Sequence, residues 1–170
     1  FNTSNETVLY FDLDVLILRD ISNLVELIRY LKYPMMLRSS DKLGEVNDWP
    51  SSSIMAWRGD MMQGVYYTVI QKGITEVIQK AYKNPSRAGQ RTDQGFIRTI
   101  INPNKFQDFL PEGYIVFKYP DYVRNPKVIE KATILNWTGK PRFTEMGESL
   151  NQIKMLWKGH VLNHKINQIL

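Results

Sequence analysis

Two acidic residues interrupt a strongly apolar stretch near the start of this 170-residue chain. Asp12 and Asp14 lie between the apolar residues 8–11 and 15–18. The β-branched, aliphatic and aromatic side chains of residues 7–11 are typical of a buried strand. Because alternate residues of an extended chain point the same way, the two carboxylates are expected to converge where this strand ends. Burying them there is costly without a partner, so the pattern favours a functional role.

The Asp12-Leu13-Asp14 pattern predicts a site for a divalent cation. Two carboxylates this close repel each other, and one keeps its proton unless a positive charge is present. Mg²⁺ or Mn²⁺ removes that conflict and binds one or two carboxylates together with phosphate oxygens. In an α/β sheet, ligands bind outside the carboxyl ends of the strands. The competing interpretation is an ordinary turn, because aspartate is common in turns.

The rest of the chain alternates strands with helices, which predicts one α/β domain over residues 1–170 with a mixed sheet flanked by helices. Apolar spacing predicts a helix over 21–31, capped by Asp20 or Ser22 and stopped by Pro34. Further helices are expected over 61–82 with a break at Gly73, over 93–101, and over a C-terminal segment at 148–170. Strands are expected over 7–11, 35–38, 54–57, 114–119 and 132–137, and loops over 41–53 and 84–91.

Composition excludes several classes of protein. The chain has no cysteine, so it has neither a disulfide nor a thiolate metal site. Its net charge of +5 comes from dispersed basic residues, too diffuse for a nucleic-acid interface but compatible with a pocket for a diphosphate. No apolar run reaches the roughly 18 residues of a membrane span. With no signal peptide at its start, the chain is expected in the cytoplasm, or in the Golgi lumen if it is a eukaryotic fragment.

Four segments, in order, resemble nucleotide-sugar glycosyltransferases of the GT-A fold, in particular family eight and its relatives. Residues 8–24, VLYFDLDVLILRDISNL, are similar to that family's strand, its DxD motif and the helix start that follows. Residues 51–57, SSSIMAW, resemble its Asn-Ser-Gly-Val-Met strand, and residues 92–97, TDQGFI, its Asp-Gln helix start. Residues 136–143, NWTGKPRF, resemble its closing His-Phe-x-Gly-x-x-Lys-Pro-Trp motif.

The resemblance implies a Rossmann-like domain that moves a hexose from a nucleoside-diphosphate sugar, a UDP-sugar by expectation, to a glycan or other hydroxyl acceptor. Mn²⁺ or Mg²⁺ would be the cofactor. The implied metal ligands are Asp12, Asp14 and Asn136, and Asp12 could instead bind the donor ribose. Residues implied to face the donor are Ser52 and Ser53 on the sugar side, Asp93 and Gln94 at the reacting sugar as the catalytic pair, and Lys140 and Arg142 at the diphosphate.

Two alternatives remain open from the sequence. The Asp-x-Asp pattern also begins haloacid-dehalogenase-like phosphatases, in which Asp12 would be the nucleophile, although the chain lacks a convincing second acidic pair. The other alternative is a non-catalytic remnant of a glycosyltransferase. Asn136 stands where the family has a histidine, and only eleven residues precede Asp12, where the family has a nucleotide-binding region. We therefore expect an incomplete domain, with its activity in isolation in doubt.

Overall fold

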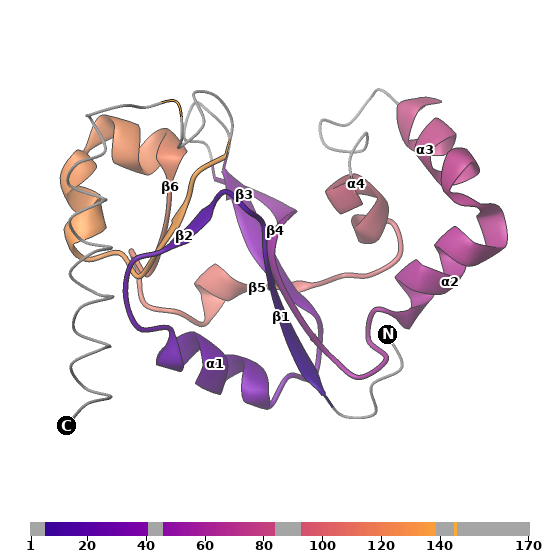
Figure 1. Ribbon diagram of the computed structural model, residues 1–170, viewed down its shortest axis with the longest axis horizontal. Helices are drawn as coiled ribbons and strands as arrows, with labels where there is room; N and C mark the ends of the chain where they lie inside the picture. The colour runs from indigo at the N-terminus through magenta and orange to yellow at the C-terminus, as the bar shows by residue number, and fades with distance from the viewer. Residues whose placement is uncertain (1–5, 41–45, 84–92, 139–144, 146–170) are drawn as a thin grey trace. The chain divides into compact units, whose positions relative to one another are not determined.

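The computed structural model describes residues 6–40, 46–83, 93–138 and 145. The chain has mixed α/β structure and divides into two compact units (Figure 1). The first unit comprises the described parts of residues 1–11, 25–39 and 48–109, and the second those of 12–24, 40–47 and 110–170. The α/β class expected from the sequence is confirmed.

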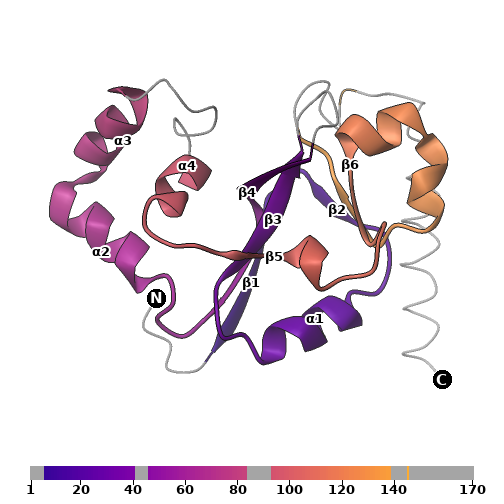
Figure 2. The same cartoon turned by 180° about the vertical axis from the view of Figure 1, so that it is seen from behind.

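The first unit is built on a four-stranded mixed sheet in the order β1-β4-β3-β5. Its strands are β1 (Thr7–Phe11), β3 (Met35–Ser40), β4 (Val46–Arg58) and β5 (Asn104–Lys105). β1 runs antiparallel to β4, with Phe11 opposite Ile54, and β3 runs parallel to β5. Figure 2 shows β3 and β4 side by side from behind. β1 has the predicted bounds, yet it is only half-buried, and Tyr10 is exposed.

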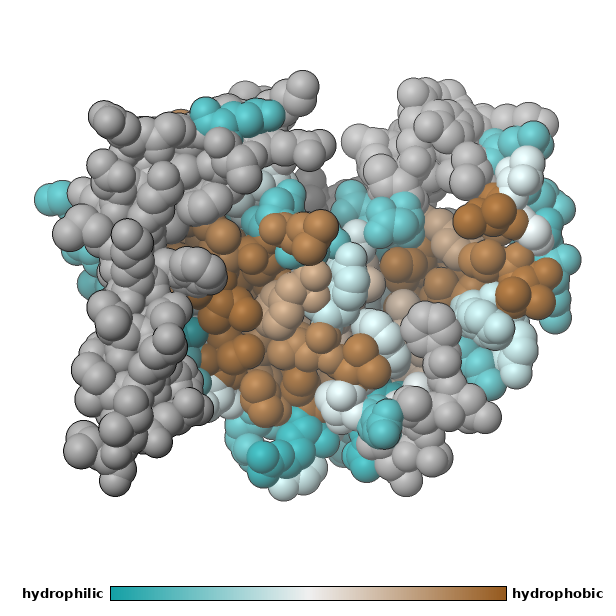
Figure 3. Space-filling view, viewed as in Figure 1, coloured by the Kyte–Doolittle hydropathy of each residue, from teal (hydrophilic) through white to brown (hydrophobic). Residues whose placement is uncertain are grey.

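Three α-helices of the first unit follow β4: α2 (Gln63–Lys72), α3 (Ile74–Lys83) and α4 (Asp93–Arg98). Gly73 separates α2 from α3, as the sequence predicted. Its φ of 75° interrupts the helix, and glycine adopts this conformation more readily than residues with a side chain. The core of this unit gathers Met36, Trp57, Met62 and Ile97. No residue of α2 is buried, and hydrophobic side chains are exposed over the α2–α3 part of the surface (brown in Figure 3).

The second unit is built on a three-stranded sheet in the order β2-β7-β6. Its strands are β2 (Val15–Ile17), β6 (Ile115–Phe117) and β7 (Ile134–Asn136), with β2 antiparallel and β6 parallel to β7. The helix α1 (Ser22–Arg29) follows β2 and runs from the second unit into the first. Asp20 lies just before α1, and its carboxylate accepts hydrogen bonds from the backbone and hydroxyl of Ser22, as expected of a residue that stabilises the helix start.

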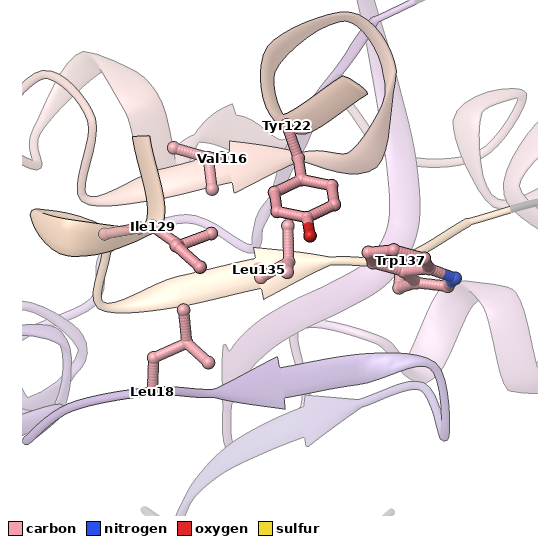
Figure 4. Close-up of a cluster of buried hydrophobic side chains, with 7 residues drawn as sticks. Leu18, Val116, Tyr122, Ile129, Leu135 and Trp137 are labelled. Atoms are coloured by element: carbon pink, nitrogen blue, oxygen red, sulfur yellow. The ribbon is translucent and has the colours of Figure 1, made fainter. Parts of the chain in front are cut away.

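The core of the second unit lies between its sheet and two short helical turns, η2 (Lys118–Tyr122) and η3 (Pro126–Glu130). Figure 4 shows Leu18, Val116 and Leu135 pointing into the same cluster as Tyr122 and Trp137. The ring centroids of Tyr122 and Trp137 are 5.4 Å apart. The guanidinium of Arg19 donates to three carbonyls in and after η3, which fixes that helical turn to the end of β2.

Three details of the predicted fold were wrong. The loop expected over 41–53 is strand from Val46 onward, although residues 41–45 lie outside the described ranges. Pro50 lies outside the last five residues of β4, which are the ones that pair with β1. The strands expected over 114–119 and 132–137 are shorter, and the strands form two sheets. The expected loop at 84–91 and helix at 148–170 lie outside the described residues.

Candidate functional site

The two aspartates lie in a turn rather than in an extended segment. The backbone N–H of Val15 donates to the carbonyl of Asp12 at 3.1 Å, which closes a turn with Leu13 fully exposed at its tip. The strand before this turn, β1, belongs to one sheet, and the strand after it, β2, belongs to the other. The extended backbone expected at Asp12 and Asp14 is therefore wrong, and the turn interpretation describes the backbone correctly. It leaves the chemistry of the two carboxylates open.

The turn lies beside Asn136, as the resemblance to glycosyltransferases implied. Val15 pairs with Asn136 across β2 and β7. The backbone N–H of the next residue, Trp137, donates to the carbonyl of Asp14 at 2.9 Å. A motif from the start of the described chain and one from near its end thus meet at one end of the three-stranded sheet.

The side chain of Asn136 is buried and finds no hydrogen-bond partner among the residues that the structure describes. Asn136 is 1% exposed, and neither Oδ1 nor Nδ2 bonds to any of these residues. Leaving a buried polar group unsatisfied costs about 1–3 kcal/mol, and native structures rarely tolerate it without a reason. Oδ1 of the neighbouring Asp14 is also buried. This end of the sheet therefore presents buried polar atoms that a ligand could satisfy.

The oxygen atoms at this end of the sheet are of the kind that hard cations bind. Carboxylate and amide oxygens are ligands of Mg²⁺ and related ions, so Asp14 and Asn136 fit the implied metal, with Asp12 in the adjoining turn. The Nδ2 group of Asn136 can only donate, and it suits an anionic or hydroxyl oxygen. Within the residues described, no group of three or more His, Cys, Asp or Glu gathers as a metal centre. The implied ligand set contains only two residues of these types, Asp12 and Asp14, because its third member is the amide of Asn136.

Lys118 is a feature of this end of the sheet that sequence reasoning missed. It follows β6 directly, is 1% exposed, and places Nζ 5.0 Å from the centre of the Trp137 ring. In the sequence it is one of the dispersed basic residues. The available signal was its position after the apolar residues 115–117, the same relation that Asp12 has to β1.

Tyr114 lies just before β6, at the end of that strand away from Lys118. Burial raises the pKa of its hydroxyl above the ordinary value of 10.0, an effect to which the charge of Asp20 adds. The phenol is therefore neutral at physiological pH.

The first unit holds the residues implied to contact the donor sugar. Ser52 and Ser53 are buried in β4, and the backbone N–H of Ser52 donates to Oε1 of Gln94 at 3.4 Å. The hydroxyl of Ser51 donates to that of Ser53 at 3.3 Å. Asp93 is exposed in the first turn of α4. The structure thus brings Ser52 and Gln94 together.

Lys140 and Arg142, implied at the diphosphate, lie outside the described residues.

In the comparisons with known proteins, no family model, curated protein or solved structure matches the chain. No helix in the described part of the chain is long and apolar enough to cross a membrane.

Proposed function

We propose that this chain is a metal-dependent glycosyltransferase domain of the GT-A type that moves a hexose from a nucleoside-diphosphate sugar to a hydroxyl acceptor. The resemblance of four ordered segments to that family supports the proposal. The observation that carries it is the meeting of the Asp12–Asp14 turn with Asn136, whose buried amide has no hydrogen-bond partner in the described part of the chain. The resemblance names both segments as parts of one metal and diphosphate site.

The residues of the second unit would act on the diphosphate end of the donor. Asp14 and Asn136 would hold a divalent cation, with Asp12 as a further ligand or as a partner of the ribose. When bound, that cation supplies positive charge to the departing diphosphate. The Nδ2 group of Asn136 would donate to a donor oxygen in a site that is already desolvated, where a fixed dipole is worth more than in water. Lys140 would add positive charge at the diphosphate.

The resemblance assigns the sugar of the donor to residues of the first unit. Gln94 already accepts a hydrogen bond from the Ser52 backbone, which holds its side-chain amide in one position. Its remaining N–H groups could then donate to a sugar hydroxyl without further loss of side-chain freedom. Asp93, exposed beside it in sequence, would face the reacting sugar. By analogy with family eight, the configuration at the sugar would be retained.

The test is a calorimetric titration of UDP into the chain with and without Mn²⁺. We expect binding that needs Mn²⁺ and that weakens at least tenfold, or ~1.4 kcal/mol, in Asp14→Ala. Glu112→Ala removes an exposed carboxylate of the same unit and serves as the matched control, with unchanged affinity expected. Binding that survives Asp14→Ala, or an absence of UDP binding by the unmodified chain, would refute the proposal for this chain.

A further inference from the structure

Lys118 is a buried lysine that the proposed function has not yet used. It directly follows β6 and lies at 1% exposure, with Nζ 5.0 Å from the Trp137 ring centre. An ammonium over the face of a tryptophan is attracted by the ring quadrupole, and more strongly when water is excluded. The ring compensates part of the cost of burying the charge. It also restricts where the ammonium can lie.

Strand register aligns Lys118 with the Asp12–Asp14 turn. Phe117 pairs with Asn136 across the parallel strands β6 and β7, so Lys118 comes level with Trp137 one residue later. On the other side of β7, Trp137 donates its backbone N–H to the carbonyl of Asp14. Asp14, Trp137 and Lys118 therefore follow one another across the end of the sheet.

The charges along this line suit an anion bound through a cation. Asp14 offers carboxylate oxygen to a metal, and Lys118 offers a positive charge on the far side of Trp137. Lysine acts as a point charge for phosphate oxygens, and its ammonium carries three donors. The carboxyl ends of β6 and β7 point to the same edge, where ligands bind in α/β sheets.

We propose that Lys118 is a diphosphate-binding residue and that Trp137 positions its ammonium. The inference rests on the proposed function, since it assigns a further residue to that same site. It adds to the Lys140 and Arg142 of the closing motif a cation at the start of η2, directly after β6. A lysine that is buried for structural reasons alone would leave anion binding unchanged when it is replaced by an apolar side chain of similar length.

The experiment titrates inorganic pyrophosphate, and separately UDP, into the full chain at a fixed concentration of Mn²⁺. Lys118→Met is compared with the unmodified chain and with Lys131→Met, which removes an exposed lysine of the same unit. We expect Lys118→Met to weaken both ligands at least tenfold and Lys131→Met to change neither. Mn²⁺ affinity, measured without phosphate, should not fall in Lys118→Met, because the variant removes a positive charge near the metal.

The outcomes separate this inference from the proposed function. Equal pyrophosphate affinity in Lys118→Met and the unmodified chain overturns the role of Lys118, while Mn²⁺-dependent UDP binding by both would leave the glycosyltransferase proposal standing. Parallel loss of Mn²⁺ and pyrophosphate binding in Lys118→Met indicates a damaged site and also overturns the inference. No binding of either phosphate ligand by the unmodified chain overturns both proposals. Lys118→Gln, which keeps a polar end, replaces the methionine variant if that variant does not fold.

Discussion

Both units bury polar side chains within or beside their sheets, but they satisfy them differently. In the first unit, Gln94 accepts a hydrogen bond from the Ser52 backbone, and the hydroxyl of Ser51 donates to that of Ser53. In the second unit, the amide of Asn136 is fully buried, and neither of its polar atoms has a hydrogen-bond partner among the described residues. The serines and Gln94 thus find partners among the described residues, whereas the Asn136 amide finds none there.

This difference distinguishes polar residues that are bonded within the described fold from one that a ligand could satisfy. A buried group with a protein partner contributes about 0.5–1.5 kcal/mol to stability, whereas an unsatisfied one costs about 1–3 kcal/mol. Functional sites commonly retain such costs, because the unsatisfied atoms become useful once a ligand binds. The comparison therefore directs attention to the end of the three-stranded sheet.

The largest effect should come from removing the ring that lies at this end of the sheet. Trp137→Ala should lower the free energy of unfolding by about 3–5 kcal/mol, because it leaves a cavity beside Leu135 and Tyr122. Trp57→Ala, in the core of the first unit, should cost a similar amount. Urea unfolding measures both costs. Below the unfolding transition, Trp137→Ala should also weaken UDP binding, since it removes the ring beneath Lys118. Unchanged UDP affinity in that variant would contradict the role of the ring.

The comparison itself predicts opposite signs for two matched substitutions. Asn136→Leu replaces an unsatisfied amide by an apolar group of similar size, so it should stabilise the free chain by roughly 1–3 kcal/mol. Gln94→Leu removes the acceptor for the Ser52 backbone N–H and should destabilise it by about 1 kcal/mol. Urea unfolding without ligands measures both. If Asn136→Leu destabilises the chain as Gln94→Leu does, the amide has a partner and the comparison fails.

A smaller effect is expected at the start of α1. Asp20→Ala removes the carboxylate that accepts from the Ser22 backbone and hydroxyl, and should cost about 1 kcal/mol. Asp20→Asn keeps a side-chain oxygen and should retain most of that stability. Thermal unfolding of the two variants checks this. A loss of equal size in both would show that the charge matters rather than the accepted hydrogen bonds.

The smallest effect concerns pH. Burial raises the pKa of Tyr114 above 10.0, so the folded chain keeps this proton at pH values where the unfolded chain has lost it. The free energy of unfolding should therefore fall as the pH rises above 10, from the ordinary pKa towards the raised one. Tyr114→Phe should lose this part of the dependence. Urea unfolding of both proteins at pH 8 and at about pH 10.5 gives the difference. Parallel pH profiles would show that Tyr114 does not contribute.

Local patterns predicted those parts of the fold that local chemistry decides. Strand β1 has its predicted bounds because its side chains favour an extended, apolar segment. The break at Gly73 follows from the positive φ of that residue. Residues 46–53 were mistaken for a loop, because tertiary pairing holds a strand whose serines and Pro50 do not favour one.

The candidate site was predictable only in part. The Asp12–Asp14 turn and Asn136 were named from a resemblance, and strand pairing brings them together. The turn geometry depends on the change of sheet between β1 and β2, which no local pattern encodes. Lys118 was missed because its contact with Trp137 cannot be seen in the sequence. The two residues are distant in sequence and come level only through the parallel pairing of β6 and β7.

The most direct test of the central claim observes the Asn136 amide itself. In a ¹⁵N-labelled chain, its side-chain NH₂ signals can be assigned as the pair that disappears in Asn136→Leu. We predict that these signals move when Mg²⁺ and UDP are added together, because Nδ2 acquires a hydrogen-bond acceptor and Oδ1 a cation. Signals that stay in place while UDP binds elsewhere, or that do not respond because no ligand binds, would contradict the account.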